Sequence, residues 1–163
     1  MTAIDSIIEE LSREAETTRR VLDRVPPDKL SWRPHQKSKT IGELAWHIAT
    51  IPQRIATVAQ HEDVDVATVK PAPMPETAAG IQQEFERQIA EAKQLLAKLD
   101  DSALAQRTTL RRGDVKFFSG PKLALLRTVM LNHSYHHRGQ LSVYLRLLDI
   151  PVPSIYGPTA DEK

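Results

Sequence analysis

Apolar residues recur three and four positions apart in four stretches of the chain, the spacing that gives an α-helix one buried face. The stretches span residues 2–24, 41–60, 77–99 and 121–148. Pro26-Pro27 ends the first of them, and Thr40 with Glu43 forms a capping-box pattern at the start of the second. The pattern therefore predicts four helices long enough to pack as a bundle.

The last stretch is apolar on two neighbouring faces, so it needs more than one neighbour. Its inner stripe is predicted to be Leu123, Leu126, Met130, His133, His137, Gln140, Tyr144 and Leu147. A second stripe beside it consists of Leu125, Val129, His136 and Val143. This helix is then either central in the bundle or in contact with another subunit.

The segment between the third and fourth helices contains a possible short hairpin over residues 108–118, where Gly113-Asp114 is flanked by apolar residues. No other segment suggests a strand. The predicted fold class is all-α, a four-helix bundle with this possible hairpin, in a single domain over residues 1–163.

Composition and charge exclude several classes of site and partner. The 163 residues carry 22 basic and 21 acidic side chains, a balance that argues against a broad nucleic-acid-binding surface. No cysteine is present, so a metal would have to bind histidine, carboxylate or water. No apolar run approaches the roughly 20 residues that span a bilayer, and residues 1–6 lack the features of a signal peptide. We expect a cytoplasmic protein with neither a nucleic-acid nor a membrane partner.

Three of the six histidines fall on inward faces. His133 and His137 are four residues apart and share one helix face, while His47 lies between the inward Leu44 and Ile51 of the second helix. A buried polar group without a partner costs about 1–3 kcal/mol, and one shared metal would satisfy all three imidazoles. Histidines that are merely hydrogen-bonded in the core are the alternative that the pattern leaves open.

The residues around these histidines resemble the DinB-like (YfiT-like) family. Residues 133–141, His-Ser-Tyr-His-His-Arg-Gly-Gln-Leu, are similar to the family signature His-x-x-His-His-Arg-Gly-Gln. Trp32-Arg33-Pro34 with residues 41–48 resembles its second-helix block, and residues 145–158 resemble its closing segment. The resemblance covers the chain in spaced blocks from about Trp32 onward.

The resemblance implies an up-down-down-up bundle with one divalent metal ion, zinc or nickel, on three histidines that by position are His47, His133 and His137. It also implies a homodimer. The family includes thiol-dependent transferases and an isomerase, so we expect a metal-dependent transferase, isomerase or hydrolase acting on a small molecule. A low-molecular-weight thiol is a possible cosubstrate. The alternative is a non-catalytic bundle protein that binds a metal or small ligand.

Several further residues have two interpretations each. Glu43 could orient a ligand or act as a base, or serve only in the capping box. Arg138 and Gln140 could bind a substrate, or form a salt bridge and a core hydrogen bond. Tyr156 could cover the metal site or simply pack. We expect His136 at a helix or subunit interface, His35 and His61 in solvent, and Trp32 and Trp46 in the core.

Overall fold

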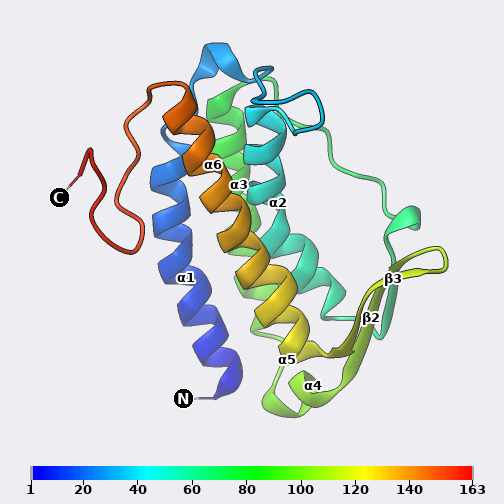
Figure 1. Cartoon of the computed structure of the whole chain (residues 1–163). Coiled ribbons are helices and arrows are strands. Elements are labelled where there is room, and N and C mark those ends of the chain that lie inside the picture. Colours follow the sequence, from blue (N-terminus) through cyan, green and yellow to red (C-terminus); the bar gives the residue numbers. More distant parts are fainter. Residues whose placement is uncertain (1, 163) are drawn as a thin grey trace.

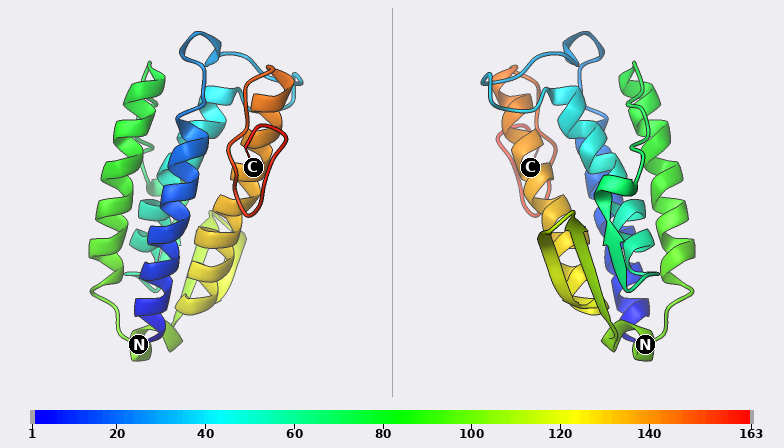
Figure 2. Two further views of the ribbon diagram at one scale, coloured as in Figure 1. Left: turned by 90° about the vertical axis from the view of Figure 1, so that its left-hand side faces the viewer. Right: turned by 90° about the vertical axis from the view of Figure 1, so that its right-hand side faces the viewer.

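Four long helices lie side by side in the computed structural model, which describes residues 2–162 (Figures 1 and 2). The first three are α1 (Ala3–Leu22), α2 (Ile41–Val58) and α3 (Ala78–Leu96). The fourth is continuous and consists of α5 (Lys122–Leu125), a π-helical segment (Leu126–Asn132) and α6 (His133–Leu147). A short helix, α4 (Asp101–Ala105), follows α3. The four predicted helices are thus confirmed.

The order of helix directions is up, down, down, up, as expected (Figure 1). α2 and α3 run the same way because the connector after the short turn Val66–Thr68 travels back along the bundle before α3 begins (Figure 1). Lys70-Pro71-Ala72-Pro73-Met74-Pro75 lies in that connector, where the prolines favour an extended chain.

Capping boxes begin two of the helices. Thr40 Oγ1 accepts a hydrogen bond of 3.1 Å from the Glu43 N–H, and Glu43 Oε2 accepts one of 2.7 Å from the Thr40 N–H. Thr2 and Asp5 form the same arrangement at the start of α1. Of the two interpretations of Glu43, the capping role is therefore the one that the structure shows, because its carboxylate accepts a hydrogen bond from the backbone N–H that precedes the helix.

The fold is mostly helical, as predicted, but it is not all-α, because three strands form a small sheet beside the lower part of the bundle (Figure 1). β2 (Arg107–Arg112) and β3 (Val115–Pro121) form the predicted hairpin, with Gly113 in the turn at a φ of 56°. β1 (Asp63–Asp65) pairs parallel with β2 and was not predicted. Three residues are too few for a strand pattern to show in the sequence.

The core lies between the four helices and includes Ile7, Leu44, Ile48, Phe85, Leu96, Leu126 and Leu145, each at most 2% exposed. The predicted inner stripe of the last helix is wrong at Gln140, which is exposed, and at Leu147, which is 58% exposed. In α6, after the π-helical segment, the buried residues are Arg138, Leu141 and Leu145. The wider π-turn rotates the following helix relative to a regular α-helix, so the buried face shifts.

No helix within residues 2–162 has the length and apolar character needed to cross a membrane.

Candidate metal centre and adjoining cavity

Two helices bring the three predicted histidines together. His47 comes from the middle of α2, His133 is the first residue of α6 after the π-helical segment, and His137 lies one turn further on. One ring nitrogen of each histidine lies within 4.8 Å of the others. His133 Nε2 and His137 Nε2 are 2.7 Å apart. The three side chains therefore converge, as predicted. Metal binding by them stays a prediction.

Gln140 fixes the orientation of one imidazole. Its Oε1 lies 2.7 Å from His137 Nδ1 and accepts a hydrogen bond from that nitrogen. The neutral ring then has its lone pair on Nε2, the atom that faces His133. Partners of this kind hold metal-binding histidines in the correct tautomer and orientation.

All three histidines are half-buried, and no acidic side chain within residues 2–162 raises their pKa values. Burial is the main cause that lowers the pKa of each ring. It acts with the charges of His137, His133, Lys39 and Arg54 to lower the pKa of His47 to about 3. The three rings are therefore neutral at pH 7, the form in which imidazole binds a metal.

The donor set fits a divalent transition metal. Two nitrogens that each lie about 2.0–2.1 Å from one ion can be at most about 4.2 Å apart. The three nitrogens here lie within 4.8 Å of one another, which is close to that limit. Three imidazoles and no thiolate suit zinc or nickel better than calcium or magnesium, which prefer oxygen ligands.

A cavity of about 380 Å³ adjoins the histidines and has His47 and His133 in its wall. α2 contributes one side, and the sheet with the turn after β1 contributes the other. The apolar lining residues are Ile51, Ile55, Val58, Val64, Val66, Val69, Leu110, Phe117 and Val129. Volume and lining are typical of a small-molecule site.

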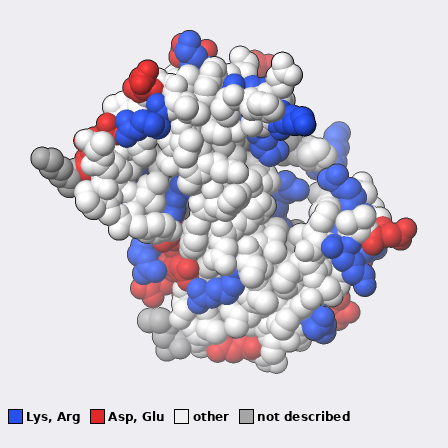
Figure 3. Space-filling view, viewed as in Figure 1, with Lys and Arg blue, Asp and Glu red and all other residues white. Residues whose placement is uncertain are grey.

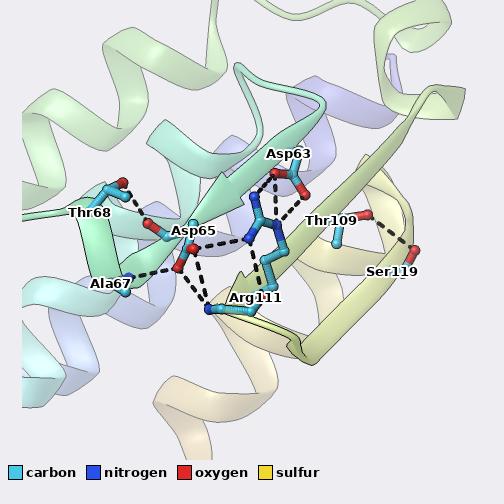
Figure 4. A network of polar contacts seen from close by, with 8 residues as sticks. Asp63, Asp65, Ala67, Thr68, Thr109, Arg111 and Ser119 are labelled. Atoms are coloured by element: carbon cyan, nitrogen blue, oxygen red, sulfur yellow. Dashed lines mark hydrogen bonds and ion pairs between the residues drawn. The ribbon is translucent and has the colours of Figure 1, made fainter.

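An ion-pair network holds the sheet wall of this cavity in place (Figure 4). The Arg111 guanidinium on β2 pairs with Asp63 and Asp65 of β1, with nitrogen–oxygen distances of 2.9 Å to each. Asp65 also accepts a hydrogen bond of 3.1 Å from the Gly113 N–H. These contacts tie the three-residue strand to the hairpin, which positions Val64 and Leu110 in the cavity wall.

Arg138 and Tyr156 do not reach the histidines. Arg138 is 1% exposed and pairs with Glu14 of α1 at 2.7 Å, so its salt-bridge interpretation is confirmed. The Tyr156 hydroxyl donates a hydrogen bond of 2.8 Å to Glu14 and also contacts the Arg138 guanidinium. This contact fastens the C-terminal segment to α1.

The remaining histidines lie outside the cluster. His136 is exposed, its ring centroid is 5.0 Å from that of His137, and it is not among the converging nitrogens. His35 and His61 are exposed, as expected. Trp32 and Trp46 are half-buried and pack against the core.

Arg54 is the main residue at this site that the sequence interpretation missed. It lies seven residues after His47, and Ile51 lies between them at the helical spacing of one face. That spacing alone could have placed Arg54 beside the histidines. The lining residues of β1 and β2 had no such local signal, because strand pairing brings them in from distant positions.

The model of the DinB family matches residues 1–163, the whole chain. The chain belongs to the DinB family. YrdA of Bacillus subtilis (strain 168), an uncharacterized protein, is 25% identical over 98% of this DinB-family chain and 91% of its own length.

Solved structures of DinB-like proteins have the same fold. A DinB-like protein from Bacillus cereus ATCC 10987 is 25% identical, with a TM-score of 0.73 over 93% of this chain and 97% of its own. YjoA from Bacillus subtilis is 19% identical, with the same TM-score over 94% and 99%. A DinB family member from Exiguobacterium sibiricum 255-15 is 17% identical, with a TM-score of 0.68 over 94% and 97%. The last two likenesses concern the fold alone.

Acid should destabilise the folded, metal-free DinB-family chain through these histidines. Their pKa values are lowered on folding, so below about pH 6.5 the unfolded chain binds protons that the folded chain does not. The free energy of unfolding should therefore fall as the pH falls from about 6.5 toward 5. Urea unfolding of chelator-treated protein at a series of pH values would measure this slope. A His47→Gln, His133→Gln, His137→Gln variant should show a smaller one, and an equal slope would contradict the assignment.

Proposed function

We propose that this DinB-family chain is a metal-dependent enzyme that holds one divalent ion, zinc or nickel, on His47, His133 and His137. Its reaction would be a thiol-dependent transfer or isomerisation, or a hydrolysis, on a small molecule. The observation that carries the proposal is the convergence of three neutral imidazoles beside a small-molecule cavity.

The residues of the chain have separable roles in this proposal. The three histidines bind the ion, and Gln140 holds the His137 ring with its Nε2 lone pair directed into the site. The apolar wall of the cavity would displace water from the neighbourhood of the histidines when a ligand fills it. A divalent ion bound there with open positions would lower the pKa of a bound water or thiol and so supply a nucleophile at neutral pH. Because the chain has no cysteine, any thiol would be an external cosubstrate.

A non-catalytic bundle protein that binds a metal or small ligand is the second candidate. The metal site alone does not distinguish the enzyme from the binding protein, since both functions need the same histidines. A turnover screen of zinc- and nickel-loaded protein, with and without low-molecular-weight thiols, distinguishes them. Turnover that is lost in His47→Ala supports the enzyme, and tight metal binding without turnover of any substrate favours the binding protein.

Metal removal should lower the melting temperature. A ligand that binds only the folded state adds about 2.7 kcal/mol at one hundred times its dissociation constant. For a chain of this size that corresponds to roughly 5–10 °C. Thermal unfolding should therefore shift down on treatment with chelator and return when zinc or nickel is added in excess. Curves that coincide with and without chelator would contradict the proposed site.

We also propose a homodimer that uses the outer face of α6. Val143 and Leu147 are 56% and 58% exposed and lie four residues apart on that face, with the exposed His136 on the same side. Of the other residues in the predicted second stripe, Leu125 is buried and Val129 lines the cavity, so neither belongs to this face. A two-fold contact would cover the exposed face with its own copy.

Val143→Asp should shift the protein from dimer toward monomer, because it places a charge in the proposed contact. Light scattering across the micromolar range measures the mass. Val115→Asp is the matched control, since Val115 is 62% exposed on β3, away from α6, and its substitution should leave the dimer intact. A mass near 18.3 kDa for the unmodified protein would rule out the dimer.

A further inference from the structure

The cavity beside the histidines is positively charged. Arg54 and Arg112 line it, and none of its lining residues is acidic. Within residues 2–162 neither arginine forms an ion pair, although the adjacent Arg111 pairs with two aspartates. Figure 3 shows Lys and Arg atoms gathered around a hollow between the bundle and the connector. An organic anion bound here would therefore supply the negative charge that pairs with these arginines.

Arg54 is the cation best placed relative to the histidines. His47, Ile51 and Arg54 follow one face of α2, and seven residues of helix separate the two ends by about 10 Å along the axis. Arg54 also acts electrostatically on both His47 and His133. Arg112 lines the same cavity from β2. A ligand with an anionic group at Arg54 would thus extend along the apolar wall toward the histidines.

The volume limits the size of that ligand. At about 30 Å³ for each liquid water molecule, a cavity of about 380 Å³ holds roughly a dozen waters. An organic ligand of about ten non-hydrogen atoms fills a comparable space. Because most of the other lining residues are apolar, among them Ile51, Val64, Leu110 and Val129, the rest of the ligand should be apolar.

We propose that the substrate is an organic acid of about ten non-hydrogen atoms, with its carboxylate at Arg54, an apolar body against the sheet wall and its reacting group at the histidines. This inference rests on the proposed function, because it assigns a substrate class to the same site. Arg is suited to the first contact, since its planar guanidinium matches a carboxylate in geometry and charge.

Octanoate and 1-octanol are the probes that test the proposal, because they share a chain length and differ in charge. Calorimetric titration of zinc-loaded protein should show octanoate binding more tightly than octanol. Arg54→Gln should weaken octanoate about tenfold and leave octanol nearly unchanged, as expected for the loss of a charge-assisted hydrogen bond. Arg54→Lys should restore part of the preference. Arg20→Gln is the matched control, since Arg20 is exposed on α1 and outside the cavity lining.

Two results would overturn the proposal. The first is equal binding of octanoate and octanol by the unmodified protein. The second is an octanoate affinity that Arg54→Gln leaves intact but chelator abolishes, which would place the carboxylate on the metal instead. Zinc content, measured on the same samples, separates this outcome from a failure of the metal site. Protein that binds zinc without preferring octanoate contradicts only the substrate class, and protein that binds neither zinc nor nickel contradicts the proposed function.

Discussion

Replacing Arg138 by Ala is expected to lower the free energy of unfolding by about 3–5 kcal/mol, because it leaves Glu14 with a charge that its surroundings no longer balance. The guanidinium of Arg138 pairs with Glu14 and donates hydrogen bonds of 3.1 Å to the Glu14 carbonyl and to Thr18 Oγ1. It also lies over the rings of Tyr135 and Tyr156, 5.3 and 5.1 Å from their centroids. One side chain therefore joins α6, α1 and the C-terminal segment.

Thermal unfolding of Arg138→Ala should show a melting temperature lower by roughly 6–20 °C. The Glu14→Leu, Arg138→Met double variant should recover much of the loss, since removing both charges leaves neither one unpaired. Arg87→Ala is the matched control: Arg87 is 50% exposed and pairs with Glu84 and Glu91, so its loss should cost less than about 1 kcal/mol. If Arg138→Ala melts within about 2 °C of the unmodified protein, the buried pair does not stabilise the fold in this way.

Replacing His47, His133 and His137 together by Ala is expected to abolish metal binding, because no nitrogen of the cluster then remains. Each single replacement leaves two imidazoles and should weaken the affinity for zinc or nickel. Gln140→Ala should have a smaller effect, about 10–100-fold in affinity, because it removes only the partner that orients His137. Equilibrium dialysis followed by elemental analysis measures all of these affinities.

His136→Ala is the control for those variants. His136 neighbours His137 in the sequence but is exposed and is not among the three converging histidines, so the variant should retain its metal. Circular dichroism confirms that each variant is folded before its metal is measured. Loss of metal in His136→Ala, or its retention in the triple variant, would mean that the wrong histidines have been assigned.

The helices could be predicted from the sequence because their signals are local. The apolar spacing marked all four, and Thr40 with Glu43 fixed the first residue of α2. The same local reasoning placed His47 on an inward face and put His133 and His137 on one face. It could not show that the two faces meet, and that step came only from the resemblance to the DinB-like family.

The sheet and the cavity depend on contacts between distant residues. Asp63, Val64 and Asp65 form a strand only because β2, more than forty residues later, pairs with them and Arg111 binds both aspartates. No periodic pattern marks so short a strand. The cavity wall was therefore invisible in the sequence, although the hairpin that forms part of it was predicted.

The π-helical segment explains the error in the last helix. Regular α-helical spacing was assumed from Leu123 to Leu147, but residues 126–132 follow the wider π-turn. The segment ends at the residue before His133, so it sets the rotation of the face that bears His133 and His137. Such irregular turns are frequent at functional sites, and here the turn directly precedes the histidine cluster.

The metal content of the unmodified protein, purified without a metal-affinity tag, is the most direct test of the proposed metal centre. Elemental analysis should find about one zinc or nickel ion per chain, held by the three converging histidines. If the protein contains no divalent metal and takes up neither zinc nor nickel when they are added, His47, His133 and His137 do not form a metal site.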